Sequence, residues 1–515
     1  MQYSLTNETT TTTETLLSRY LQNLDGAPLH SGAAAFYASL DVLNQASPLV
    51  AQSIVQELDD QRTNLKLIAS ENYSSLATQL AHGNLFTDKY AEGYAGHRFY
   101  AGCDNVDTIE SEAARLACEL FDARHAYVQP HSGADANLVA YLAILSAKVQ
   151  SPILTELGQE DPQKVSREDW AKVRSAFQNQ RLLALDYYSG GHLTHGYRHN
   201  ISSRLFDVYS YSVDPDTKLL DLDQLRTQLH EIKPLILLGG YSAYPRRINF
   251  AKLRELADEV GAVLMVDMAH FAGLVAGGVF EGDFNPVPHA HIITSTTHKT
   301  LRGPRGGLVL SQEDDLAGWV DKGCPLILGG PLPHVMAAKA VAFREALTPE
   351  FRTYAHAIVE NAQALAQACI EQGIEVLTGG TDNHLLLLDV QATYGLTGRQ
   401  AESALRQCRI TLNRNSLPFD ANGPWYTSGL RLGTPATTTL GMGEPQMREI
   451  ARLIHRTLSN TTIALTSKGE KSRANFVLDA DIAAEVKSDV AALLTDYPVY
   501  PELDLNLLRQ AVPRN

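Results

Sequence analysis

The sequence predicts an α/β fold, with a large domain built on a mostly parallel β-sheet and a smaller α+β domain after it. The first observation is that short apolar runs of strand length alternate with segments whose apolar residues recur at helical spacing. This alternation is typical of βαβ units, in which a helix connects two parallel strands. The second observation is the composition, because 44% hydrophobic and 20% charged residues are close to globular averages and allow large buried cores.

The individual elements are predicted from their apolar patterns. Residues 107–121 carry apolar side chains at helical spacing, and residues 232–240 form a short apolar run that closes with Gly239 and Gly240. The other predicted elements of the large domain are a helix at 250–260 and strands at 262–266, 290–295 and 308–311. After residue 350, amphipathic helices at 354–372, 398–408 and 444–459 flank a short strand at 385–390.

The chain of 515 residues is long enough for two or three domains. We expect a flexible N-terminal extension (1–48), a large domain (49–349) and a small C-terminal domain (350–515). The extension is expected because a Thr-rich tract is followed by a stretch rich in Gly, Ala and Pro. Residues 144–183 are polar and contain two prolines, so we expect an insertion in the large domain.

Charge and cysteine content exclude several classes of protein. A formal net charge of −15 and a pI near 5.6 argue against general attraction to nucleic acid or to anionic lipid. The five cysteines are scattered and form no C-x-x-C pair, so neither a disulfide framework nor a metal site is expected. The N-terminus lacks the basic and then apolar order of a signal peptide, and no apolar run approaches the roughly 20 residues of a membrane span. We therefore expect a cytoplasmic protein with no membrane association.

Two polar residues follow neighbouring strands of the predicted sheet. Asp267 ends the strand at 262–266, and Lys299 follows the strand at 290–295. In such sheets ligands bind outside the carboxyl ends of the strands. Pyridoxal phosphate needs a lysine for its Schiff base and an acid partner for its pyridine nitrogen. Taken singly, the aspartate is more often a helix cap and the lysine more often solvated, but their joint placement favours a cofactor site.

A third element of this pattern is the turn Gln129-Pro130-His131-Ser132-Gly133-Ala134, which precedes a predicted helix. Backbone N–H groups at a helix N-terminus bind phosphate through unpaired donors and the helix dipole. Ser-Gly turns also cap many ordinary helices, so this signal is weak alone.

A series of motifs resembles the serine hydroxymethyltransferase family, which has the aspartate-aminotransferase-like fold (fold type I of the pyridoxal phosphate enzymes). In order along the chain they are Leu67-Ile68-Ala69-Ser70-Glu71-Asn72, Lys89-Tyr90-Ala91-Glu92-Gly93-Tyr94, Ser132-Gly133, Gly190-Gly191-His192-Leu193-Thr194-His195-Gly196, Val266-Asp267-Met268-Ala269-His270, Thr296-Thr297-His298-Lys299-Thr300-Leu301, Gly303-Pro304-Arg305-Gly306-Gly307, Gly379-Gly380-Thr381-Asp382-Asn383-His384 and Arg431-Leu432-Gly433-Thr434-Pro435. The resemblance runs from about residue 50 to the C-terminus and leaves out the extension and the insertion.

The resemblance implies roles for individual residues. Lys299 would hold pyridoxal 5'-phosphate covalently, Asp267 would pair with its pyridine nitrogen and His192 would stack on its ring. The other residues implied in cofactor binding are Ser132, Gly133, Ser242, His270, His298, Tyr90 and Gly330. The catalytic set implied is Lys299, Glu92, His192, Tyr100 and Asp267.

The resemblance also implies two substrate sites and a dimer. Arg431 would bind the substrate carboxylate through its planar guanidinium, and Ser70, Glu92 and Tyr100 would complete the amino-acid site. Tetrahydrofolate, the co-substrate, would meet Tyr187, Gly191, Leu193 and Asn415. In the family Tyr90, Glu92, Tyr100 and the glycines corresponding to Gly329-Gly330 come from the neighbouring subunit, so a homodimer is implied; the sequence does not distinguish it from a tetramer.

Three positions depart from the family pattern. Ala134 stands where a hydroxyl residue usually follows the Ser-Gly of the phosphate turn, so one phosphate hydrogen bond is missing. Leu326-Ile327-Leu328 replaces the usual Gly-Gly-Gln, and Tyr187 occupies a position that is usually apolar and faces the pterin. We expect these changes to leave the cofactor site intact and to affect folate binding.

Three functions remain open at this point. The first is reversible one-carbon transfer from serine to tetrahydrofolate, which yields glycine and 5,10-methylenetetrahydrofolate. The second keeps the cofactor but drops folate, as in an aldolase for β-hydroxy amino acids or an alanine racemase. The third is a pyridoxal-phosphate-binding protein whose main role is to bind a partner, against which the acidic charge and the complete catalytic set argue.

Overall fold

The computed structural model describes residues 15–159 and 161–512, and contacts between Cα atoms divide the chain into two compact units. One unit contains the described residues up to 64 together with those from 494 onward. Its helices are α1 (Leu16–Gln22), α2 (Ser31–Ala46), α3 (Pro48–Thr63) and α23 (Leu505–Ala511). The N-terminal and C-terminal segments of this unit contact each other. The Arg62 guanidinium donates to the carbonyl oxygens of Val499 at 2.9 Å and Leu503 at 2.8 Å.

Residues 15–48 differ from the flexible extension that we expected for residues 1–48. The Thr-rich tract lies mainly within residues 1–14, outside the described residues, but α1 and α2 are regular helices. Ala33, Tyr37 and Leu40 lie on one face of α2 and are almost completely buried. Burial of this apolar face stabilises the helix, and the small residues that suggested flexibility are compatible with close helix packing.

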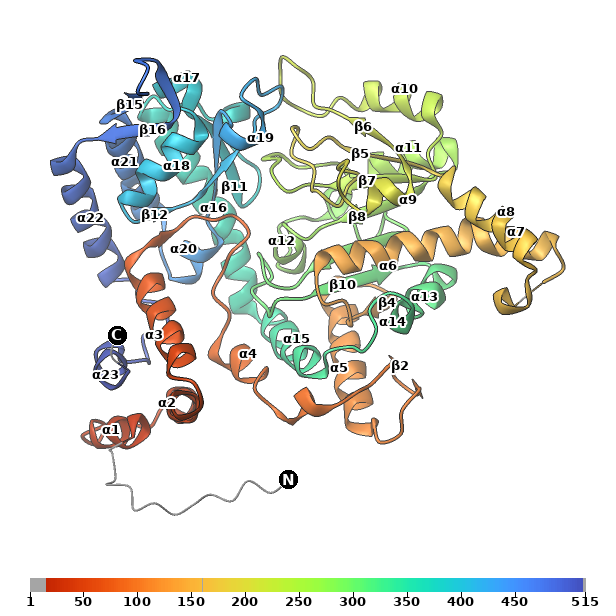
Figure 1. The fold of residues 1–515 in the computed structure, drawn as a ribbon, viewed down its shortest axis with the longest axis horizontal. Coiled ribbons are helices and arrows are strands. Elements are labelled where there is room, and N and C mark those ends of the chain that lie inside the picture. Colours follow the sequence, from red (N-terminus) through yellow and green to blue (C-terminus); the bar gives the residue numbers. More distant parts are fainter. Residues whose placement is uncertain (1–14, 160, 513–515) are drawn as a thin grey trace. The chain divides into compact units, whose positions relative to one another are not determined.

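The second unit (65–493) contains a seven-stranded sheet (Figure 1). In spatial order its strands are β4 (His125–Tyr127), β10 (Gly307–Ser311), β9 (Ile292–Thr296), β8 (Val263–Asp267), β7 (Ile236–Gly240), β5 (Arg181–Leu185) and β6 (Asp207–Tyr211). The strands from β9 to β6 pair in parallel, and β10 pairs antiparallel with both of its neighbours. The predicted α/β class with a mostly parallel sheet is therefore confirmed.

The central strands are apolar throughout because both faces of the sheet are covered. Leu237 of β7 and Leu264 of β8 belong to one buried cluster, whereas Ile236 and Met265 belong to a second cluster. Side chains of a strand alternate between faces, so the two clusters lie on opposite sides of the sheet. The helices α5 (Asp104–Phe121), α6 (Gly133–Leu145), α10 (Leu222–Ile232) and α11 (Phe250–Val260) connect or cover these strands.

Element boundaries agree with the sequence prediction for the most regular segments. The helices predicted at 250–260 and 444–459 have those bounds in α11 and in α21 (Glu444–Ser459). The strand predicted at 232–240 begins only at Ile236, because Ile232 is the last residue of α10 and Lys233 has a left-handed backbone with φ of 49°. An apolar run does not reveal where a helix ends and the next strand begins.

The later part of the second unit contains a three-stranded antiparallel sheet in the order β11 (Leu385–Asp389), β14 (Gly429–Gly433), β13 (Asn413–Asn415). The helices α16 (Pro349–Glu371) and α18 (Gly398–Gln407) accompany it together with α21. The helices and the strand predicted after residue 350 are thus present. Contact grouping leaves residues 65–493 together, and the boundary at 349 stays a prediction.

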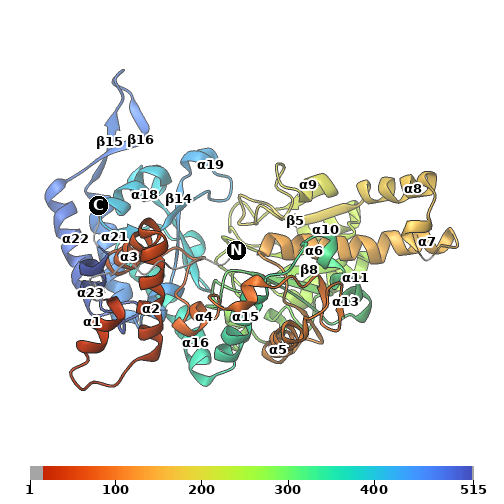
Figure 2. The same ribbon diagram turned by 60° about the horizontal axis from the view of Figure 1, so that its bottom comes forward.

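A β-hairpin of β15 (Thr461–Leu465) and β16 (Lys471–Leu478) projects beyond α18 in Figure 2. The strand β16 is tied to α18, because Gln400 Nε2 donates to the carbonyl oxygens of Ser472 at 2.8 Å and Asn475 at 2.9 Å. The Arg473 guanidinium donates to Asn422 Oδ1 at 2.9 Å and lies over the ring of Tyr426, 4.3 Å from its centre. The hairpin therefore supports the loop that carries Asn422 and Tyr426.

The predicted insertion at 144–183 is a helical projection. The helix α6 continues through a π turn (Ser146–Gln150) into α7 (Ser151–Glu156), and α8 (Arg167–Gln178) returns toward β5. In Figures 1 and 2 this pair extends beyond the sheet. The continuous helix 133–156 is long and apolar enough to span a membrane, which corrects the expectation that no apolar run approaches that length. Its most apolar window is 56% buried, as in a helix that covers a core.

The remaining helices and strands are short or peripheral. They are β1 (Leu65–Lys66), paired in parallel with β12 (Ile410–Thr411), α4 (Leu76–Leu80), β2 (Gly93–Tyr94), β3 (His97–Arg98), α9 (Ser202–Leu205), α12 (Ala272–Ala276), α13 (Asp314–Val320), α14 (Gly323–Leu326), α15 (Pro333–Ala346), α17 (Val390–Tyr394), α19 (Gly423–Tyr426), α20 (Pro435–Thr439) and α22 (Ala480–Thr495).

The packing of the central sheet predicts a large cost for truncating one of its side chains. Leu237 is completely buried, so Leu237→Ala leaves a cavity and is expected to lower the free energy of unfolding by about 2–5 kcal/mol. The midpoint of urea denaturation, followed by circular dichroism, measures this effect. Val477→Ala, at a side chain that is 59% exposed, is the control and should change the midpoint little.

Candidate active site

The carboxyl ends of three neighbouring strands meet at one point of the central sheet. Asp267 is the last residue of β8, and Gly240 is the last residue of β7 beside it. A side chain at Gly240 would lie 2.0 Å from the Asp267 carbonyl oxygen, so only glycine permits this approach. Lys299 follows β9, and its Nζ donates to Thr296 Oγ1 at 3.0 Å. The two residues predicted to share a ligand therefore end adjacent strands.

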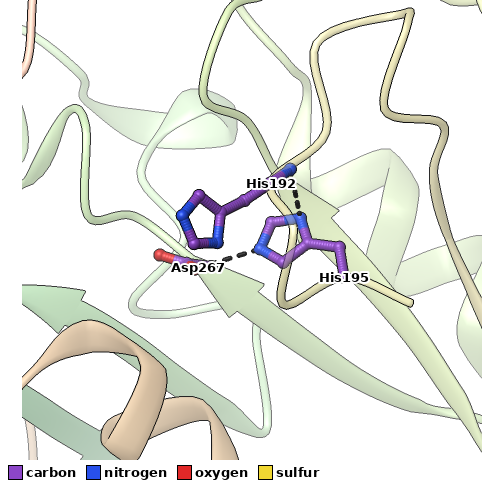
Figure 3. A group of neighbouring side chains, drawn as sticks. All are labelled: His192, His195 and Asp267. Carbon is purple, nitrogen blue, oxygen red and sulfur yellow. Dashed lines mark hydrogen bonds and ion pairs between the residues drawn. The ribbon is translucent and has the colours of Figure 1, made fainter. Parts of the chain in front are cut away.

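Three hydrogen bonds hold the Asp267 carboxylate, and Figure 3 shows the one from His195. Oδ2 lies 3.0 Å from His195 Nε2 and 2.9 Å from Asn137 Nδ2, and Oδ1 accepts from the Ala269 N–H at 3.0 Å. Burial alone would raise the pKa of Asp267, but the hydrogen bonds from His195 and Asn137 hold it well below its usual value. The site thus contains a buried carboxylate that is charged at neutral pH.

His192, His195 and Asp267 are close enough together to suggest a metal site, since their ligand atoms lie within 4.8 Å of one another. Hydrogen bonding argues against it. His195 Nδ1 accepts from the His192 N–H at 3.3 Å, so its Nε2 carries the proton that faces Asp267. His195 therefore orients the carboxylate and has no lone pair to offer a metal ion.

Lys299 lies in an environment that favours its neutral amine. Burial lowers its pKa to about 8, while Asp267 acts in the opposite direction and the charges of Arg431 and Arg305 lower it further. A larger fraction of this amine is unprotonated near neutral pH than for an ordinary lysine. An unprotonated amine is the form that attacks an aldehyde.

A cavity of about 260 Å³ opens beside this point. Its lining contains all four residues expected to bind folate, Tyr187, Gly191, Leu193 and Asn415. It also contains His192, Ser242 and Arg431, which were expected at the cofactor and the substrate. The remaining lining comes mainly from the loop after β13, at Ser416, Pro424 and Thr427. The structure therefore brings three predicted sets of residues to one cavity.

Arg431 lies on β14 and reaches the cavity across the Ser242 loop. Its guanidinium donates to the Ser242 carbonyl oxygen at 2.7 Å, to Ser242 Oγ at 3.0 Å and to Asn413 Oδ1 at 3.1 Å. Burial lowers its pKa to about 10, so it is still a cation at neutral pH. In the described part of the chain no carboxylate forms an ion pair with it, which leaves its charge available to an anionic ligand.

His270 connects the cavity to the core. Its Nδ1 lies 3.1 Å from His384 Nε2, and its Nε2 lies 3.4 Å from Ser242 Oγ. Burial and the charges of Lys299 and Arg431 hold the pKa of His270 well below its usual value, and burial lowers that of His384 to about 3. Both rings are therefore neutral and serve as hydrogen-bonding groups rather than as additional charges.

The predicted phosphate turn lies at the N-terminus of α6. Ser132 is the N-cap, and its Oγ accepts from the Asp135 N–H at 3.1 Å and donates to Asp135 Oδ2 at 2.9 Å. A side chain at Gly133 would lie 2.7 Å from Thr296 Cγ2, so the turn packs against the residue that binds Lys299. The turn, the lysine and the carboxylate are thus parts of one site.

A second group of predicted residues lies elsewhere. Tyr90 donates to Glu92 Oε1 at 3.3 Å, and its ring centre is 5.0 Å from that of Tyr100. A side chain at Gly330 would lie 3.3 Å from the Tyr90 ring. Tyr90 is 56% exposed and Tyr100 46% exposed, and within the described chain none of these four residues lines the cavity. They form a separate exposed group.

The loop that carries Tyr90 and Glu92 is held rigidly despite its exposure. Arg98 donates to the carbonyl oxygens of Ala91 at 2.9 Å and Gly93 at 3.1 Å, and it pairs with Glu110 at 2.5 Å. Because Arg98 is nearly buried, these are charge-assisted bonds of low solvent screening. The exposed tyrosines and Glu92 are therefore presented on a fixed backbone.

The other predicted residues belong neither to the cavity lining nor to the group around Tyr90. Ser70 follows the segment that pairs with β14, because the Gly433 N–H donates to the Leu67 carbonyl oxygen at 2.9 Å. His298 is half-buried next to Lys299, and burial lowers its pKa to about 3. Of the unusual loop residues, Leu326 is 65% exposed, whereas Ile327 and Leu328 pack against the second core cluster.

Three residues of the site were given no role from the sequence. Asn137 lies in α6, His195 in the segment after β5 and His384 just before β11, so they approach Asp267 or His270 only when the chain is folded. His195 and His384 stand in stretches that resemble the family, which was the available signal. Asn137 lies inside α6, where no local pattern separates it from any other buried polar residue.

Comparison with known proteins finds a family that matches most of this chain. The family described as "Serine hydroxymethyltransferase" matches residues 43–155 and 171–454. The chain is 60% identical to the serine hydroxymethyltransferase of Treponema pallidum over 96% of this chain and 86% of that protein. It is 57% identical to that of Salinispora tropica (92% and 98%) and 54% identical to that of Cutibacterium acnes (92% and 96%). The family match omits residues 156–170, which lie inside the predicted insertion.

The lowered pKa of Lys299 can be measured on cofactor-free protein. Reductive methylation with formaldehyde and cyanoborohydride modifies unprotonated amines, and we expect Lys299 to reach half of its maximal rate near pH 8. In the urea-denatured protein the same residue should need a pH near about 10.4. Peptide-resolved mass spectrometry measures both profiles, and coincident profiles would contradict the environment described for this amine.

Proposed function

Because this chain belongs to the serine hydroxymethyltransferase family, we propose that the cavity beside Lys299 is the site of the family's reaction. The protein is a pyridoxal-phosphate-dependent transferase. It transfers a one-carbon unit reversibly between serine and tetrahydrofolate and so forms glycine and 5,10-methylenetetrahydrofolate. The observation that carries the proposal is that Lys299, Asp267 and Arg431, three groups with different tasks in this reaction, lie close together. The charges of Asp267 and Arg431 both act on Lys299, and Arg431 lines the cavity.

The residues of the site fit pyridoxal phosphate. Lys299 supplies an amine with a lowered pKa, and Asp267 supplies a buried, permanently charged carboxylate for the pyridine nitrogen. The Ser132-Gly133 turn offers the free N–H groups of α6 to the phosphate. His298, next to Lys299, has a buried Nδ1 without a partner in the described chain, as expected where a ligand would bind.

When bound, pyridoxal phosphate supplies an electron-withdrawing ring that weakens the bonds at the amino acid Cα. Asp267 keeps a proton on the ring nitrogen, because a charged carboxylate opposite it favours the protonated form. His195 and Asn137 hold that carboxylate in one orientation. We assign His192, which lines the cavity above Asp267, the task of stacking on the ring.

Arg431 binds the carboxylate of serine or glycine. Its present partners are the neutral Ser242 and Asn413, which a carboxylate can replace without breaking an ion pair. Ser70 belongs to the same amino-acid site. The neutral rings of His270 and His384 allow Ser242 to face the cofactor's phenolic oxygen without adding a second positive charge.

Tetrahydrofolate occupies the outer part of the cavity. Tyr187 and Leu193 offer flat and apolar surfaces to the pterin, Gly191 contributes backbone to the wall and Asn415 offers an amide. Tyr187 packs against Tyr188 and Tyr197, with ring centres 5.6 Å and 5.3 Å away, so its hydroxyl-bearing ring has a fixed position. The aromatic side chain takes the place of the usual apolar one without closing the cavity.

Glu92 acts in the partner's site of a homodimer. Glu92, Tyr90, Tyr100 and Gly330 are rigidly presented yet lie apart from the cavity of their own chain, which is the arrangement expected of residues that complete a neighbouring site. There Glu92 exchanges protons with the serine hydroxyl and Tyr100 lies beside it. We propose a cytoplasmic homodimer on these grounds.

Folate dependence tests the proposed function. Tetrahydrofolate should accelerate serine cleavage by the wild-type protein, and Asn415→Ala should raise the KM for tetrahydrofolate about tenfold, because one hydrogen bond is lost. Cleavage of β-phenylserine, which requires no folate, is the control and should be unchanged in the variant. Equal serine cleavage with and without tetrahydrofolate would instead indicate a folate-independent aldolase.

Complementation between two inactive variants tests the shared site. Lys299→Ala and Glu92→Gln should each be inactive as homodimers, since each lacks one required group in both sites. After mixing under conditions that exchange subunits, a hybrid dimer has one site with both native residues, so about a quarter of the wild-type activity should return. If Glu92 serves its own chain, no hybrid site is complete and the mixture stays inactive.

A further inference from the structure

The buried Lys339 is an ionisable group without a role in the reaction described above. It lies in the middle of α15 (Pro333–Ala346), and the residue is only 1% exposed. Its ammonium donates to three backbone carbonyl oxygens, those of Val128 at 2.6 Å, Pro130 at 3.0 Å and Gly307 at 2.9 Å. All three of its N–H donors are thereby used, and none of them faces solvent.

The three carbonyl groups lie on both sides of the phosphate turn. Val128 and Pro130 immediately precede Ser132, and Gly307 is the first residue of β10. The Gly307 N–H donates to the Pro130 carbonyl oxygen at 2.9 Å, and a side chain at Gly307 would lie 2.2 Å from the Ser132 carbonyl oxygen. The ammonium of Lys339 therefore holds the turn against the first residue of β10, at the point where the two segments lie closest together.

The charge of Lys339 has no direct counter-ion in the protein. Among the described residues no carboxylate lies within ion-pair distance of it, and the acids whose charge acts on it are Glu110 and Asp135. Glu110 is already paired with Arg98, and Asp135 is engaged with Ser132. Burial lowers the pKa of Lys339 to about 7, and the two acids act against this effect.

A buried cation that is bonded only to neutral carbonyl groups is costly unless an anion lies nearby. The Ser132-Gly133 turn, which follows two of the carbonyl groups that Lys339 binds, would hold the dianionic phosphate of the cofactor. The attraction in this low-dielectric region adds to that of the α6 dipole. Ala134 provides no hydroxyl to the phosphate, so the turn depends more strongly on these fixed charges.

We propose that Lys339 is a positioning residue for the cofactor phosphate, which holds the Ser132-Gly133 turn in place and supplies a positive charge behind it. The inference rests on the proposed cofactor site. It predicts that the contribution of Lys339 is specific to the phosphate group and does not extend to the pyridine ring.

The comparison of pyridoxal phosphate with pyridoxal, which lacks the phosphate, tests this proposal. Both dissociation constants are measured on cofactor-free protein by absorption titration. Lys339→Gln keeps part of the hydrogen bonding but removes the charge, and it should weaken pyridoxal phosphate binding about ten- to a hundredfold. Pyridoxal binding should change less than about twofold. An equal loss of affinity for both ligands would show that Lys339 only stabilises the turn, and it would overturn the proposal.

Two further variants complete the experiment. Lys148→Gln removes the charge of a surface lysine in the continuous helix 133–156, where Lys148 pairs with Asp315, and should alter neither constant. Lys339→Met covers the case in which Lys339→Gln does not fold, because methionine has a similar length, carries no charge and brings no polar group into the buried position. It should also weaken pyridoxal phosphate binding about ten- to a hundredfold and change pyridoxal binding less than about twofold; unchanged pyridoxal phosphate binding, or an equal loss for both ligands, would contradict the proposal. A wild-type protein that binds neither ligand would refute the cofactor site itself.

Discussion

A carboxylate that stays charged inside the protein is the constraint on which the rest of the site depends. Burial works against the charge of Asp267, and only the convergence of His195, Asn137 and the Ala269 N–H keeps it ionised. These groups come from β8 and from segments that follow β4 and β5, so the charge exists only when the sheet is assembled. The ionised carboxylate of Asp267 therefore depends on the close approach of β7 and β8 at Gly240 and on the apolar strands that place it there.

The fold and the centre of the site could be predicted from sequence because they follow local patterns. Apolar runs mark buried strands, and the polar residue after each run marks the edge at which ligands bind, which is how Asp267 and Lys299 were found together. His195 and Asn137 could not be given their role in this way, because their partner is distant in sequence and their own surroundings carry no periodicity. Lys339 was missed for a related reason, since a lysine in an amphipathic helix is normally solvent-exposed. The helices of residues 16–46 were missed because small residues suggest flexibility when their packing partners are unknown.

Charge is distributed very unevenly in this acidic protein. The net charge is −15, yet the groups at and behind the cavity are Lys299, Arg431 and Lys339, with Asp267 as the buried acid. The surrounding histidines stay neutral, so they add hydrogen bonds without adding repulsion between cations. Such a site attracts anions with carboxylate and phosphate groups, while the acidic surface elsewhere repels nonspecific polyanions.

The β15–β16 hairpin extends this reasoning to a segment that lies outside the cavity. The family match ends at residue 454, whereas the hairpin begins at Thr461 and holds the Asn422–Tyr426 loop through Arg473. Pro424 of that loop lines the cavity. Part of the cavity wall is therefore braced by a hairpin that does not itself line the cavity. Substitutions in this hairpin can alter the outer pocket while every residue that touches the reacting atoms stays the same.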